Sequence, residues 1–115
     1  MNLRITSVED INTDKERIEL EALDDDNTTN YILLYASSQQ DVEDANRIRE
    51  AFWFPSQALK KGDIVRVFTK SGQSSSIRLS NKSKRYTFYW GLKAATAKEN
   101  RQNPKLLRII ESNAK

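Results

Sequence analysis

Basic side chains, with aromatic ones among them, are the residues of this 115-residue chain whose type and spacing could do chemistry. Between Asp63 and Glu99 the sequence contains no acidic residue. Clustered Lys and Arg can neutralise phosphates or carboxylates, and an accessible aromatic ring can stack on a base. The alternative is a solvated basic surface that only keeps the protein soluble. The candidate partner-binding residues are Lys60, Lys61, Arg66, Lys70, Arg78, Lys82, Lys84, Arg85, Tyr89 and Lys93.

Charge is divided unevenly between the two halves of the sequence. Residues 1–50 hold 13 acidic and 5 basic side chains, a balance of −8, whereas residues 51–115 hold 3 acidic and 14 basic ones, a balance of +11. The net charge of +3 hides this difference. The asymmetry favours an anionic partner for the second half, unless strands from the two halves interleave in the fold and neutralise each other.

The composition excludes several classes of site. The chain has no Cys and no His, so disulfides, zinc sites built from these ligands and catalysis by a histidine base cannot form. Its three glycines fall at predicted turns rather than in a phosphate-binding loop. Asp24-Asp25-Asp26 lacks the alternating ligand spacing of a calcium loop and predicts a solvated turn. We therefore expect a protein that is not an enzyme and holds no metal or cofactor.

The expected location follows from hydropathy. No apolar run approaches the roughly 20 residues that span a bilayer. Met1 to Asp10 contains no apolar block like that of a signal peptide. The sequence predicts a cytoplasmic protein without a membrane span, or an exported one if the chain is an excised domain.

Short segments in which apolar and polar residues alternate dominate the pattern, and they predict an all-β fold of seven to eight strands. In the segment 17–22, for example, Ile18, Leu20 and Ala22 are expected to face inward. Val42, Ala45 and Ile48 recur at helical spacing, which predicts a short helix near 40–48. The other predicted strands are 3–6, 31–35, 51–54, 64–69, 76–79, 85–90 and 106–110.

The same alternation assigns faces to the candidate binding residues. Arg66 lies opposite its neighbours Val65 and Val67, and Arg78 lies opposite Ile77 and Leu79, so both guanidinium groups are expected to point outward from one sheet. The turn residues Lys82, Lys84 and Arg85 would extend that surface. Tyr89 is the one aromatic residue expected near it as a stacking surface.

Large rings gather near residue 53 of the sequence. Phe52 and Phe54 point to one face of a strand and Trp53 to the other, so at least one ring is expected outside the main core. That ring could dock under the predicted helix near 40–48, or it could form an exposed apolar patch of the kind that marks a protein contact.

An ordered set of segments resembles the lamin tail domain, an immunoglobulin-like β-sandwich known from nuclear lamins and many bacterial proteins. The resemblance covers most of the chain, and it implies a single lamin-tail-like domain over residues 1–115. It supports the fold better than it supports a function. The segments that carry it are Phe52-Trp53-Phe54-Pro55, Leu59-Lys60-Lys61-Gly62-Asp63, Ile64-Val65-Arg66-Val67, Thr69-Lys70-Ser71-Gly72 and Phe88-Tyr89-Trp90-Gly91-Leu92.

The sequence as a whole predicts a noncatalytic binding or adaptor module that recruits or inhibits a macromolecular partner, with a protein as the first choice. The alternative is nonspecific binding of nucleic acid or another polyanion through the basic face of residues 60–93. An exposed edge strand could also permit a homodimer by strand addition.

Overall fold

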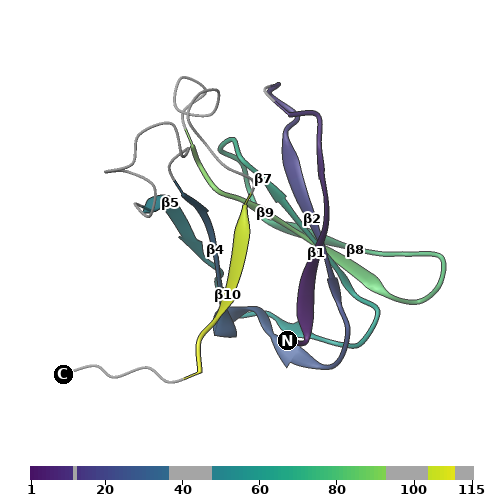
Figure 1. The fold of residues 1–115 in the computed structure, drawn as a ribbon. Helices are drawn as coiled ribbons and strands as arrows, with labels where there is room; N and C mark the ends of the chain where they lie inside the picture. Colours follow the sequence, from purple (N-terminus) through teal and green to yellow (C-terminus); the bar gives the residue numbers. More distant parts are fainter. Residues whose placement is uncertain (12, 37–47, 93–103, 111–115) are drawn as a thin grey trace. The chain divides into compact units, whose positions relative to one another are not determined.

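The computed structural model describes residues 1–11, 13–36, 48–92 and 104–110 (Figure 1). Within these ranges it contains ten strands, of which β3 and β6 have two residues each, and one short 3-10 turn, η1. The all-β fold class is confirmed. The elements are β1 (Leu3–Glu9), β2 (Arg17–Ala22), β3 (Asp26–Asn27), η1 (Thr28–Asn30), β4 (Tyr31–Ala36), β5 (Ile48–Trp53), β6 (Ala58–Leu59), β7 (Ile64–Phe68), β8 (Ser75–Arg78), β9 (Lys84–Tyr89) and β10 (Lys105–Arg108).

The chain forms two compact units, each assembled from two separate stretches of sequence. The first unit comprises Met1–Asp26 and Leu59–Glu99, and the second comprises Asn27–Ala58 and Asn100–Lys115. The prediction of a single domain over residues 1–115 stays a prediction. The predicted helix near 40–48 lies outside the described residues except for Ile48, which begins β5.

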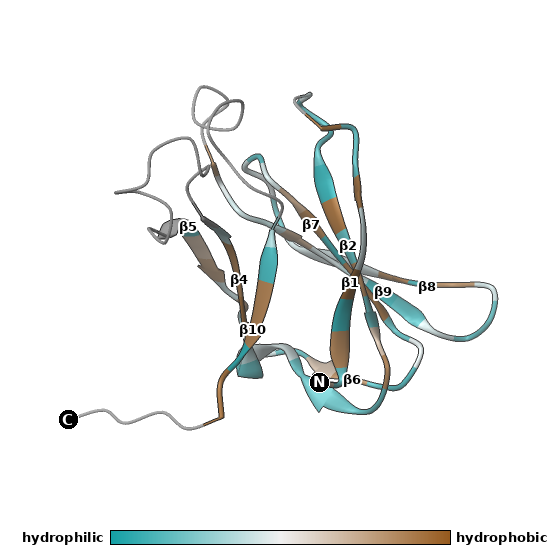
Figure 2. Ribbon diagram, viewed as in Figure 1, coloured by the Kyte–Doolittle hydropathy of each residue, from teal (hydrophilic) through white to brown (hydrophobic). Residues whose placement is uncertain are grey.

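A five-stranded sheet with the order β1-β2-β7-β9-β8 forms the first unit. Neighbouring strands are antiparallel except for β7 and β9, which run parallel. Along β2, Ile18, Leu20 and Ala22 are buried as expected, and Val65 and Val67 of β7 share their face. Figure 2 shows this alternation of hydrophobic and hydrophilic residues on β2. Burying each larger aliphatic side chain stabilises the unit by about 1.5–3 kcal/mol.

A tight turn before β7 ties the start of that strand to β2 and β9. Gly62 has a φ of +93°, as its place in front of a strand predicts, because a residue without a Cβ adopts this conformation most easily. Its N–H donates to the carbonyl of Ala22 at 2.8 Å. The buried carboxylate of Asp63 accepts hydrogen bonds from the backbone N–H groups of Lys60 (2.9 Å) and Lys84 (3.0 Å). Asp63 therefore holds two basic segments together.

A three-stranded antiparallel sheet with the order β10-β4-β5 forms the second unit. Its central strand, β4, covers the predicted strand 31–35, and Tyr31, Leu33, Leu34 and Tyr35 are all buried. The ring outside the core is Trp53, which is 64% exposed while its indole N–H donates to the carbonyl of Thr29. The proposed docking of a ring under residues 40–47 lies outside the described part of the chain.

Candidate functional site

The structure separates the candidate binding residues that lie on the sheet of the first unit from those at its β8 edge. Arg66 lies in the middle of the sheet, and Lys70 and Tyr89 lie near the end of β7. At the other end, β8, β9 and the turn between them form a hairpin over residues 75–89. We call the part that carries Arg78, Lys82, Lys84 and Arg85 the basic hairpin. Lys93 lies outside the described residues.

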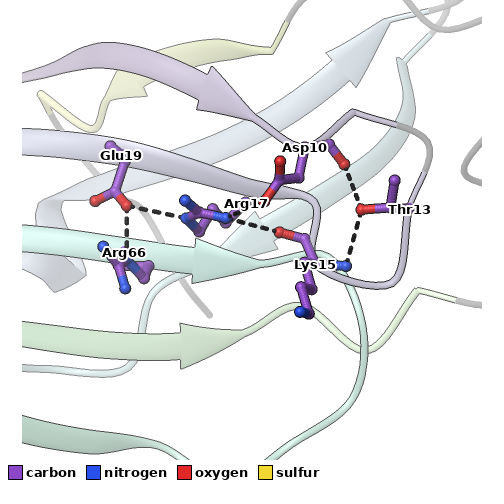
Figure 3. Close-up of polar contacts among 6 residues, drawn as sticks. All are labelled: Asp10, Thr13, Lys15, Arg17, Glu19 and Arg66. Atoms are coloured by element: carbon purple, nitrogen blue, oxygen red, sulfur yellow. Dashed lines mark hydrogen bonds and ion pairs between the residues drawn. The ribbon is translucent and has the colours of Figure 1, made fainter.

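Arg66 is held by an acidic partner, which corrects the expectation of a guanidinium group free in solvent (Figure 3). Its Nε lies 2.6 Å from Oε1 of Glu19, directly across from it on β2, and the two side chains are only 25% and 14% exposed. Glu19 also lies 3.4 Å from Nε of Arg17, whose Nη1 lies 2.7 Å from Asp10. At this point the acidic and basic halves of the sequence interleave and neutralise each other.

Strand register also corrects the prediction that Arg66 and Arg78 point outward from one face. Arg66 pairs with Thr87, and Thr87 pairs with Ser75, so these side chains share a face with Ile77. Arg78 pairs with Lys84 and lies on the opposite face. Ile77, expected to be inward, is 47% exposed, because β8 is an edge strand whose four residues are all exposed. Arg78 is exposed as expected, but not on the face of Arg66.

Tyr89 lies on the expected face, but its ring is packed against neighbours. It stacks on Phe68, which pairs with it across β7 and β9, with ring centroids 5.3 Å apart and planes 15° apart. Lys70 places its Nζ 5.5 Å from the centre of the Phe68 ring. Gly72 lies so close to Tyr89 that a Cβ there would be 2.3 Å from the ring. Tyr89 is therefore a packing residue. Phe68 was missed, although it lies two residues from Arg66.

The close approach of Gly72 to the Tyr89 ring predicts how a substitution at Gly72 changes the free energy of unfolding. We expect Gly72→Ala to destabilise the protein by about 1–3 kcal/mol, because an extra methyl group must displace the ring. Urea unfolding of G72A, Y89A and the double variant measures this. If the ring causes the strain, G72A costs little when Tyr89 is already Ala. An equal cost in both backgrounds would show that the Tyr89 ring is not the cause.

The basic hairpin carries cations that the fold does not neutralise. Arg78, Lys82 and Lys84 are exposed and Arg85 is half-buried. Within the described residues, the ion pairs of the first unit involve none of these four. Asp63, the carboxylate nearest to the start of β9, accepts backbone N–H groups instead. The hairpin is thus a local surplus of positive charge.

Other residues near this end of the sheet are the exposed pair Lys60 and Lys61. The turn that holds them is fixed to β9 by Asp63, but the backbone N–H of Lys61 also donates to the carboxylate of Asp25 at 2.8 Å. Asp24 and Asp25 are both exposed. The carboxylates of Asp24 and Asp25 lie near this turn and lower its local surplus of positive charge, although no ion pair to either lysine is formed among the described residues. Lys60 and Lys61 are therefore weaker candidates than the residues of the hairpin.

Burial and the charges around the basic hairpin shift the pKa of Tyr86. Tyr86 lies on the same face as Arg78, two residues along β9 from Lys84. Burial raises the pKa of Tyr86, the negative charge of Asp63 raises it further, and the positive charge of Arg78 lowers it. The phenol is therefore neutral at physiological pH and adds no negative charge beside the hairpin.

No group of three or more acidic side chains is placed to hold a metal ion in the part of the chain that the structure describes. The same part has no helix long and apolar enough to cross a membrane. No protein-family model, curated protein or solved structure matches this chain.

Proposed function

We propose that this protein is a noncatalytic binding module that contacts an acidic segment of a partner protein through the basic hairpin. The observation that carries the proposal is the Arg78–Lys84 pair, two cations directly opposite each other on neighbouring strands. Such like-charge pairs destabilise a sheet by roughly 0.2–1 kcal/mol. A carboxylate from a partner would turn this repulsion into attraction.

The backbone at Lys82 supports the same proposal. Lys82 has a φ of +72°, in the left-handed region where glycine is favoured over any residue with a Cβ. A lysine there places a cation at the tip of the hairpin at a cost in stability, so its charge is the better explanation for its presence.

Lys82 also allows a prediction that separates stability from binding. We expect Lys82→Gly to stabilise the protein by about 0.5–1 kcal/mol, since glycine adopts this φ without strain. The same change should weaken binding of an acidic peptide, because one cation is lost. Lys82→Ala is the control, and it should weaken binding without stabilising. Urea unfolding and fluorescence anisotropy measure the two effects, and a K82G variant that binds as tightly as wild type would contradict the proposal.

Nonspecific binding of nucleic acid is the second candidate function. The same four cations could neutralise phosphates without reading bases, with affinities on the order of 10⁻⁴–10⁻⁶ M. Two observations favour the protein partner. The ring expected to stack on bases, Tyr89, is packed against Phe68 and Gly72, and the hairpin ends in an open strand edge that a peptide can pair with.

The resemblance to the lamin tail domain supports the same kind of role, because it implies a module that acts by contact. An immunoglobulin-like sandwich of the sheets and a single domain are part of this proposal. A cytoplasmic location is also proposed, since a chain without cysteine needs no oxidising compartment.

The proposal is tested by titrating a fluorescent polyglutamate peptide with the wild-type protein at about 0.05 M and 0.5 M salt. We expect binding at low salt that weakens steeply at high salt, with polyglutamine as the uncharged control. No binding of polyglutamate at low salt would overturn the proposal. A single-stranded DNA that binds more tightly than polyglutamate would replace it with the second candidate.

A further inference from the structure

The two edges of the five-stranded sheet differ in how well they are protected. The β1 edge carries an irregularity between Ile5 and Ser7, a kind of bulge that discourages another strand from pairing. The β8 edge pairs with β9 through four consecutive residues without a register shift, and all four are exposed. β8 is the last strand in the order of this sheet, and Figure 1 draws it at the right of the view. The open edge of the first unit is therefore β8.

The hydrogen bond next to the turn shows which backbone groups of β8 face outward. The N–H of Leu79 donates to the carbonyl of Ser83 at 2.7 Å. Antiparallel pairs alternate between hydrogen-bonded and non-hydrogen-bonded, so Ile77 and Ser75 direct their N–H and C=O groups toward β9. The backbone groups of Ser76 and Arg78 consequently point to the open edge, where they can pair with an incoming strand.

The side chains beside this edge define what an incoming strand should carry. On one face Arg78 and Lys84 lie opposite each other. On the other face Ile77 is 47% exposed and lies at the open edge, with the half-buried Arg85 paired to it on the inner side, on β9. Successive residues of a strand point to opposite faces, so a strand added at β8 would place alternate residues beside Arg78 and beside Ile77. Acidic residues suit the first position and apolar residues suit the second.

We propose that the open edge of β8 binds an extended segment of a partner protein in which acidic and apolar residues alternate. This inference rests on the proposed function and adds the way in which the partner binds. Backbone hydrogen bonds to Ser76 and Arg78 fix the segment, and the two side-chain positions select its sequence. A second copy of β8 is disfavoured as the occupant, because in an antiparallel pair of β8 strands both Arg78 side chains would lie on the same face of the joined sheet and repel each other.

The test uses a synthetic peptide of about six residues in which Glu and Val alternate, and the same peptide with alternate backbone nitrogens methylated. Methylation removes backbone donors and leaves the charges unchanged. We expect the methylated peptide to bind the wild-type protein about tenfold more weakly, since it loses part of the strand ladder. Equal binding of the two peptides would overturn strand addition while leaving the hairpin as a charged contact surface.

A variant of the protein gives the matching result from the other side of the interface. Ser76→Pro removes the outward N–H of Ser76 without removing a donor to β9, and a proline is tolerated on the outer edge of a sheet. We expect about tenfold weaker binding of the alternating peptide. Ser74→Pro, one residue before β8, is the control and should bind like wild type. Equal binding by S76P and wild type would contradict strand addition.

The outcomes of these binding experiments distinguish failure of strand addition from failure of the proposed function on which it rests. If the alternating peptide binds and methylation has no effect, strand addition fails and the acidic contact stands. If neither peptide binds at low salt, both fail. Tighter binding of single-stranded DNA than of the alternating peptide would overturn both in favour of a nucleic-acid surface.

Discussion

We expect the variant R78Q/K82Q/K84Q/R85Q to bind polyglutamate about 100-fold more weakly than the wild-type protein at low salt. Each exposed charge contact contributes about 0.2–1 kcal/mol, and four together account for this loss. The four side chains lie on one hairpin and form no ion pair among the described residues of the first unit. Arg78, Lys82 and Lys84 are exposed to a ligand, and Arg85 is half-buried with its Nε shielded from solvent. Fluorescence anisotropy measures the affinity.

The matched control removes two Arg and two Lys from exposed positions elsewhere. It is R4Q/K15Q/K105Q/R108Q, which changes the net charge by the same amount. Among the described residues, the ion pair it removes is that between Arg4 and Glu21, which is exposed at the protein surface and contributes little to stability. We expect the control to bind within about threefold of wild type, because only long-range attraction is lost. Equal losses in the two variants would mean that net charge, rather than the hairpin, sets the affinity.

We expect Asp63→Ala to lower the free energy of unfolding by about 2–4 kcal/mol. The buried carboxylate accepts two backbone N–H groups, those of Lys60 and Lys84, through part-buried hydrogen bonds. A fully buried donor that loses its acceptor costs about 1–3 kcal/mol, so each of these two should cost about 1–2 kcal/mol. Asp63→Asn keeps the size and one oxygen acceptor, so it should lose about half as much. Urea unfolding gives these values.

Asp14→Ala is the control for the Asp63 variants, because Asp14 is exposed on a turn and its loss should cost less than about 0.5 kcal/mol. The Asp63 variants should also weaken peptide binding slightly, since Asp63 anchors the start of β9 beside the basic hairpin. A D63A variant as stable as D14A would contradict the structural role of the carboxylate.

Much of the strand arrangement was predictable because alternation fixes which residues share a face. The inward positions of β2, the buried strand β4 and the positive φ of Gly62 all followed from local pattern and turn chemistry. These predictions depend only on residues that are adjacent or nearly adjacent in the sequence, so the sequence alone is enough to make them.

The corrections concern contacts between strands that are far apart in the sequence. Glu19 neutralises Arg66 because β2 pairs with β7, and alternation within either strand does not reveal this pairing. Tyr89 is covered because the parallel pairing of β7 and β9 places Phe68 beside it. Ile77 is exposed because β8 is at the edge, which only the strand order shows. The candidate site is therefore smaller than predicted: it comprises the residues of the basic hairpin rather than the whole basic face of residues 60–93.

The most direct test of the basic hairpin as the binding surface is a titration of the ¹⁵N-labelled protein with the alternating Glu–Val peptide, followed by backbone amide NMR signals. The account predicts that the largest shifts fall on residues 75–85, with Ser76 and Arg78 foremost, and that β1 and the sheet of β4, β5 and β10 change little. Shifts that are largest in the second unit, or spread evenly over all exposed lysines and arginines, would contradict it.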